Sequence, residues 1–155
     1  MTLERDEKFM RAALKEAKKA LGQTSPNPAV GAVLVINNRI VAKGHHLGAG
    51  RDHAEIECLR DFGALVPARA TLYVTLEPCS TAGRTAPCTD AILKAGVRNV
   101  VVGATDVNPC HSGKGIAIFV TGFAASTLTP HQRAITNRIC EPALPWQRRT
   151  INDLS

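Results

Sequence analysis

Thr71-Leu72-Tyr73-Val74-Thr75-Leu76-Glu77-Pro78-Cys79 is the stretch that decides how the rest of the chain is interpreted. Its first six residues, with Ala70 before them, are mostly apolar or β-branched, which predicts a buried strand over 70–76. Cys79 therefore follows the carboxyl end of a strand, where open α/β sheets usually bind their ligands. This position makes Cys79 a candidate ligand.

The sequence on both sides of this strand predicts alternating helices and strands. Before it we expect a helix over 4–21 that Gly22 ends, strands over 30–36 and 40–44 joined by an Asn37-Asn38 turn, and a helix that starts at about 53. After it we expect a helix over about 88–95 that Gly96 ends, and a strand over 99–103. This order predicts an α/β layered domain whose crossover helices cover the sheet.

The apolar pattern weakens after about Ile118. Residues 121–155 are dense in Thr, Pro and Arg, and Pro130, Pro142 and Pro145 interrupt any helix there. We therefore assign residues 1–120 to one domain and treat 121–155 as an atypical C-terminal segment that packs poorly.

Composition limits the classes of protein to which the chain can belong. The 155 residues are 45% hydrophobic, and no apolar run is long enough to cross a membrane. The charged N-terminus resembles no secretory signal, and five cysteines are an odd number, so we expect a cytoplasmic protein without a disulfide framework. The net charge of +6 suits a solvated basic surface, an anionic small substrate or nucleic acid, and the 4% aromatic content argues against nucleic acid.

Two short motifs lie at the edges of predicted elements. The first is His53-Ala54-Glu55, and the second is Pro78-Cys79 followed, after eight intervening residues, by Cys88, which a proline precedes. One histidine and two cysteines suit Zn²⁺ and leave its fourth position open for water. Either motif alone is weak evidence, but zinc deaminases combine a His-x-Glu, a Pro-Cys pair and a glutamate that transfers protons without binding the metal. The joint occurrence predicts His53, Cys79 and Cys88 as zinc ligands and Glu55 as the catalytic acid/base.

The other cysteines give no comparable signal. Cys58 lies five residues after His53 on the same predicted helix, which favours a core position over a ligand role. Cys110 and Cys140 have no partner at metal-ligand spacing.

Residues 5–118 resemble the deaminase domain of riboflavin biosynthesis, within the cytidine-deaminase-like superfamily. Cytidine and tRNA-adenosine deaminases usually place two residues between the cysteines, whereas this chain and the riboflavin branch have eight. The motifs that carry the resemblance are Thr24-Ser25-Pro26-Asn27-Pro28-Ala29-Val30-Gly31, Gly44-His45-His46, His53-Ala54-Glu55, Leu72 to Ser80, Gly83 to Asp90, Asp106-Val107-Asn108-Pro109 and Gly113-Lys114-Gly115-Ile116.

The resemblance implies a fold and a reaction. The fold is a three-layer α/β/α domain around a central mixed, mostly five-stranded sheet, here over 1–120, and the family tends to form dimers or tetramers. The reaction is zinc-dependent hydrolysis of the 2-amino group of 2,5-diamino-6-ribosylamino-4(3H)-pyrimidinone 5′-phosphate, with Glu55 moving the protons. The partner is thus a small phosphorylated pyrimidine rather than a membrane or a nucleic acid.

The resemblance also implies substrate contacts. Asn27 and His46 match positions that line the substrate pocket, and Arg84, Asp106 and Asn108 match positions on the ribose phosphate side. Amide, guanidinium and carboxylate groups suit a ring edge, a phosphate and sugar hydroxyls respectively. Two simpler roles stay open: Asn27 could serve only its turn, and Arg84 could be an ordinary loop cation.

The chain departs from the family pattern in three places. Thr81 replaces a histidine that contacts substrate, His45 replaces a common aromatic residue, and residues from 119 onward match neither the usual helix and strand nor a reductase domain. Thr81 keeps open a deaminase of another amino-heterocycle, either a free base or a nucleoside. A deaminase-fold protein that binds without catalysis is the other alternative, although a structural zinc site would normally have four protein ligands.

Overall fold

The computed structural model describes residues 3–83, 86–106 and 111–118. The elements of this part follow one another as α1 (Leu3–Lys18), β1 (Gly31–Ile36), β2 (Arg39–His45), α2 (Ala54–Phe62), β3 (Thr71–Val74), α3 (Cys88–Lys94) and β4 (Asn99–Val102). Residues 114–118 are also helical. The predicted order of helices and strands is confirmed. None of the helices described here is long and apolar enough to span a membrane.

The strands form one mixed sheet in the order β2-β1-β3-β4. β1 pairs antiparallel with both β2 and β3, and β3 pairs parallel with β4, with α3 as the crossover between them. The predicted Asn37-Asn38 turn joins β1 to β2, and both residues have positive φ (49° and 62°), as a tight two-residue hairpin requires. The described residues hold four strands, so the fifth strand that we expected has no counterpart among them.

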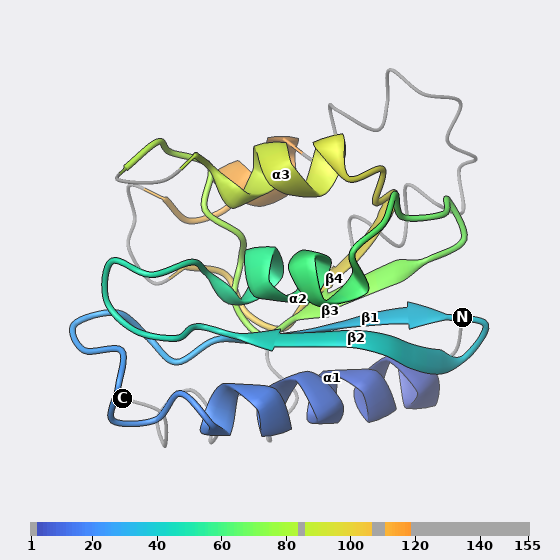
Figure 1. Ribbon diagram of the computed structural model, residues 1–155, viewed down its shortest axis with the longest axis horizontal. Helices are drawn as coiled ribbons and strands as arrows, with labels where there is room; N and C mark the ends of the chain where they lie inside the picture. Colours follow the sequence, from blue (N-terminus) through green and yellow to red (C-terminus); the bar gives the residue numbers. More distant parts are fainter. Residues whose placement is uncertain (1–2, 84–85, 107–110, 119–155) are drawn as a thin grey trace.

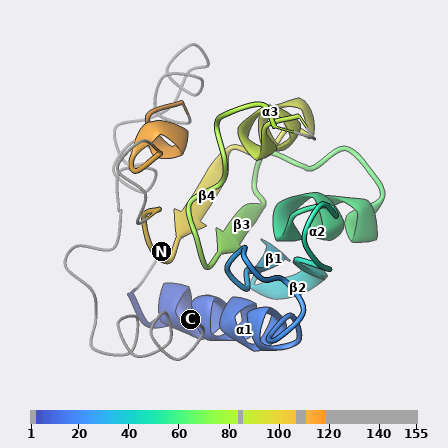
Figure 2. The same ribbon diagram turned by 90° about the vertical axis from the view of Figure 1, so that its left-hand side faces the viewer.

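Helices cover both faces of the sheet, which gives the predicted three layers (Figures 1 and 2). α1 lies on one face, while α2 and α3 lie on the other. Side chains alternate between the faces accordingly, since successive residues of a strand point in opposite directions. The core cluster between α1 and the sheet includes Phe9, Val33, Val35, Tyr73 and Val101. The cluster under α2 and α3 includes Ala32, Leu34, Leu72, Val74, Ile92 and Val100.

The end of α1 differs from the sequence prediction. The helix stops at Lys18 rather than at 21, and turns lead to Gly22, which adopts the expected left-handed conformation (φ 78°). Because Leu21 lies beyond the helix, it leaves the apolar face and is 42% exposed. The predicted boundary was therefore about one turn too long.

Candidate metal centre and active site

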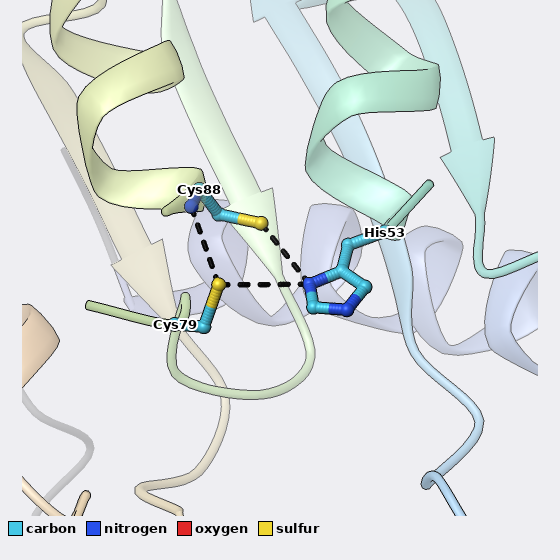
Figure 3. Close-up of side chains that lie close together, drawn as sticks. All are labelled: His53, Cys79 and Cys88. Atoms are coloured by element: carbon cyan, nitrogen blue, oxygen red, sulfur yellow. Dashed lines mark hydrogen bonds between the residues drawn. The ribbon is translucent and has the colours of Figure 1, made fainter. Parts of the chain in front are cut away.

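Two helix starts and the loop after β3 bring the predicted ligands together (Figure 3). His53 is the residue immediately before α2, in extended conformation, and Cys88 is the first residue of α3. Cys79 lies in the loop that follows β3. The three side chains point toward one another in the close-up, with the histidine ring facing both sulfur atoms.

The distances between these side chains fit a tetrahedral metal. His53 Nδ1 lies 3.2 Å from Cys88 Sγ and 3.7 Å from Cys79 Sγ, and all three ligand atoms lie within 4.8 Å of one another. Zinc bonds of ~2.3 Å to sulfur and ~2.0–2.1 Å to nitrogen place neighbouring tetrahedral ligands about 3.5–3.8 Å apart. The donor set and its spacing therefore fit a zinc ion with a fourth position available.

The hydrogen bonds around the cysteines favour a thiolate at Cys79. The Cys88 thiol and the backbone N–H of Cys88, the latter at 3.2 Å, donate to Cys79 Sγ, and the pKa of Cys79 falls well below its usual range. The same pairing raises the pKa of Cys88, because its thiol serves as the donor, and burial raises it further. The hydrogen bond to Cys79 raises the pKa of His53. A thiol must lose its proton before it binds a metal, and Cys79 is therefore already in the form that a metal requires.

Glu55 lies in the first turn of α2, two residues after His53, and is 3% exposed. Burial raises the pKa of its carboxyl group to about 7. It shares a cavity of ≈ 140 Å³ with His53 and Cys79. The residues that line this cavity are Asn27, Pro28, Val30, His46, His53, Glu55, Leu76, Glu77, Cys79 and Asp106.

One part of the cavity wall carries a short chain of polar groups. His46 is 2% exposed, and its ring packs edge-on against that of His53, with ring centroids 5.2 Å apart. Its Nδ1 donates to the carbonyl oxygen of Asp52 at 3.0 Å, and its Nε2 faces the side-chain amide of Asn27 at 3.4 Å. Asn27 and His46, both predicted from the resemblance, thus adjoin each other at the cavity.

The remaining predicted contacts divide into two groups. Asp106 follows β4 and lines the cavity. Arg84 and Asn108 lie outside the described residues. Thr81, at the position where the family has a histidine, is exposed.

Four residues that line the cavity, Pro28, Val30, Leu76 and Glu77, were not among the predicted site residues. Leu76 and Glu77 directly precede Pro78-Cys79, and this adjacency to a predicted ligand was the available signal for a site role. The hydrogen bonds of the Glu77 carboxylate, however, come from backbone groups distant in sequence. Cys58, by contrast, is fully buried in the core cluster under α2, as expected, and burial raises the pKa of its thiol to about 12.

Comparison with known proteins agrees with this geometry. Residues 3–104 match the family described as the cytidine and deoxycytidylate deaminase zinc-binding region. The riboflavin biosynthesis protein RibD of Aquifex aeolicus is 52% identical over 116 residues, which are 75% of this chain and 32% of the relative. The diaminohydroxyphosphoribosylamino-pyrimidine deaminase of Buchnera aphidicola subsp. Schizaphis graminum is 45% identical over 112 residues, 72% of this chain and 76% of the relative.

Solved structures show the same relationship. Acinetobacter baumannii RibD, form 1, superposes with a TM-score of 0.74 at 43% identity, over 78% of this chain and 34% of that chain. The chain thus spans about a third of the RibD proteins and about three quarters of the Buchnera deaminase. It belongs to the cytidine and deoxycytidylate deaminase zinc-binding family, in the branch of the riboflavin-biosynthesis deaminases.

Proposed function

We propose that the chain is a zinc-dependent hydrolytic deaminase of 2,5-diamino-6-ribosylamino-4(3H)-pyrimidinone 5′-phosphate. The observation that carries this proposal is the convergence of His53, Cys79 and Cys88 on one point, with the buried Glu55 in the same cavity. A closed structural zinc site would need a fourth protein ligand and would leave Glu55 without a task. Within the described residues, the metal-binding group consists of these three side chains alone.

The size of the cavity agrees with a single ring. An apolar cavity of about 150 Å³ accepts a benzene-sized molecule, and this one measures ≈ 140 Å³. Asn27, His46 and Asp106 add polar groups to its wall. A pyrimidine ring would fill the cavity, and its ribose phosphate would extend outward toward residues after β3 and β4.

The proposed chemistry assigns a separate task to each group. Zinc, when bound by His53, Cys79 and Cys88, supplies the Lewis acidity that makes water a nucleophile at neutral pH. Glu55 takes a proton from the attacking water and gives it to the ring nitrogen. After water has added to the ring carbon, Glu55 takes the remaining proton from the new hydroxyl group and gives it to the exocyclic amine. The carbon–nitrogen bond then breaks, ammonia leaves and a ring carbonyl remains, with Glu55 back in its starting state.

A second function is favoured by one observation. Thr81 stands where the family has a substrate-contacting histidine, so the part of the pocket outside the ring differs from the family pattern. A deaminase of a free base or nucleoside would use the same zinc and the same glutamate. Ammonia release from the phosphorylated diaminopyrimidinone, measured beside cytosine, guanine and their nucleosides, separates the two functions. Fast release from the phosphorylated compound alone supports the first, and preference for a free base or nucleoside overturns it.

We also propose a homo-oligomer, a dimer or a tetramer, in the cytoplasm, on the strength of the family resemblance. Light scattering coupled to size-exclusion chromatography would measure the mass of the assembly. A strictly monomeric protein at the concentration of the activity assay would contradict this part of the proposal.

A further inference from the structure

The buried carboxylate of Glu77 joins the loop after β3 to the segment after β4. Glu77 is 6% exposed. Its Oε2 accepts hydrogen bonds from the backbone N–H groups of Asp106 (3.1 Å) and Gly113 (2.9 Å). Its Oε1 accepts from the N–H groups of Gly115 (2.8 Å) and Ile116 (3.3 Å). One side chain thus holds backbone donors on both sides of residues 107–110.

These bonds leave the carboxylate no free acceptor position. Two carboxylate oxygens offer about four lone-pair sites, and four N–H donors occupy them here. Three of the donors belong to the start of the helical residues 114–118, where a negative charge is favoured. Although Glu77 lines the cavity, its oxygens are committed to the backbone rather than to a ligand.

The packing of Gly115 supports the same conclusion independently. A Cβ atom at Gly115 would lie 2.3 Å from the carbonyl oxygen of Pro78 and 3.3 Å from Glu77 Oε1. Glycine therefore permits the close approach that brings these N–H groups within reach of the carboxylate. The backbone N–H of Glu77 also donates to the carbonyl oxygen of Ala104 at 2.8 Å. Main chain and side chain of Glu77 together hold the segment that contains Asp106.

We propose that Glu77 is a positioning residue for substrate binding, which acts by fixing Asp106 on the cavity wall. This inference rests on the proposed function, because it assigns Asp106 to the ribose side of the substrate. The N–H of Asp106 donates to Oε2 of Glu77, the oxygen that also accepts from Gly113, so loss of this bond frees Asp106 to shift. Glu55 lies on α2 and Cys88 begins α3; Cys79 shares the loop of Glu77, but its Sγ is held by the backbone N–H of Cys88. Glu77 should therefore govern affinity for substrate rather than the chemical step.

The test is Glu77→Gln, which preserves size but turns an amide NH₂ toward backbone N–H donors. We expect KM for the phosphorylated pyrimidine to rise roughly tenfold or more while kcat stays within roughly twofold, the pattern of lost uniform binding. Zinc content should stay at the wild-type level. Glu7→Gln is the matched control, because Glu7 pairs with Arg11 on α1, on the far face of the sheet. A kcat loss without a change in KM would overturn the proposal.

Hydrogen exchange supplies a readout that needs no substrate. In Glu77→Gln the amides of Gly113, Gly115 and Ile116 should exchange faster, while those of β1 and β3 keep their wild-type rates. Unchanged exchange at these three amides would overturn the proposal even if KM rose. A wild-type protein inactive on every pyrimidine would refute the proposed function, whereas exchange would still decide whether Glu77 fixes the segment. If Glu77→Gln fails to fold, Glu77→Asp is the second variant, because it keeps the negative charge on a shorter side chain. It must show a smaller increase in KM of the same kind.

Discussion

The backbone N–H of Cys88 donates a hydrogen bond to Sγ of Cys79 over 3.2 Å, so the two cysteines contact each other directly although eight residues separate them. The next N–H, that of Thr89, donates to the carbonyl oxygen of Cys79 at 3.2 Å. The start of α3 is thereby fixed against the loop after β3. Ligands held by the backbone in this way lose little conformational freedom when a metal binds.

The first prediction concerns metal content. Purified protein should carry about one zinc per chain, and Cys79→Ala should lose it, because two remaining ligands cannot replace the missing thiolate. Elemental analysis after dialysis measures both. Cys58→Ala is the matched control, since Cys58 is a buried cysteine of the core. Zinc that survives Cys79→Ala but not Cys58→Ala would refute the assigned ligand set.

The second prediction concerns proton transfer. Glu55→Gln keeps the shape of the side chain but removes its capacity to accept a proton, so turnover should fall by roughly 10²–10⁴-fold with zinc retained. The matched control is Glu57→Gln on the same helix, where Glu57 pairs with Arg60 at 2.6 Å near the surface. Steady-state ammonia release and zinc content are measured on both variants. Near-normal turnover in Glu55→Gln would mean that another group moves the protons.

Sequence alone could predict most of the fold and the three side chains that form the candidate metal site, because these depend on local pattern. The apolar, β-branched runs of the buried strands and the Asn37-Asn38 turn leave a direct trace in the sequence. The three candidate ligands also leave a trace in the sequence, because each lies at the edge of a predicted helix or strand. His53 and Cys88 stand at helix starts and Cys79 after a strand, as the order of elements predicted.

Sequence could not predict features that depend on contacts between distant segments. Glu77 meets backbone donors between 29 and 39 residues later in the chain, and no spacing rule anticipates them. Glu16 is a charged residue of α1, yet only 6% of its side chain is exposed. Lys19, just after α1, and Lys43 and His45 on β2 lie within 4 Å of its carboxylate, so residues of a distant strand contribute to its environment.

The third prediction concerns alkaline stability. Burial raises the pKa of Cys58 from its ordinary 9.0 to about 12, so between these values the unfolded chain has lost a proton that the folded chain keeps. Stability conferred by the protonated thiol is therefore complete below pH 9 and declines as pH rises toward about 12. Denaturant unfolding of the zinc-loaded protein across this range should show a steeper decline for wild type than for Cys58→Ala. Parallel curves would refute the assignment.

The fourth prediction concerns Arg84, which the family resemblance assigns to the phosphate. Arg84→Ala should remove a charge-assisted contact of roughly 1.5–3 kcal/mol, or about 10–150-fold in kcat/KM. The loss should be large for the phosphorylated substrate and small for its dephosphorylated form. Arg69→Ala is the control, since Arg69 is an exposed arginine that precedes β3, at the end of that strand away from the metal centre. Equal losses with both substrates would show that Arg84 does not bind the phosphate.

The last prediction decides whether Asn27 serves the substrate or only its own turn. The carbonyl of Asp52 can only accept, so Nδ1 of His46 carries the hydrogen, and in the uncharged ring Nε2 accepts from the Asn27 amide. The amide oxygen of Asn27 is then oriented as an acceptor at the cavity.

Asp supports a turn as well as Asn does, and here Thr24 holds the turn at 2.7 and 2.8 Å through bonds to the Asn27 backbone. Asn27→Asp should therefore fold with unchanged stability. It cannot donate to His46, however, and its charge alters the cavity wall, so KM should rise roughly tenfold, the equivalent of about 1.4 kcal/mol. Thermal unfolding and steady-state kinetics on the same preparation measure both quantities. A wild-type KM in Asn27→Asp would show that Asn27 serves only the turn, and the substrate contact would then be assigned to His46.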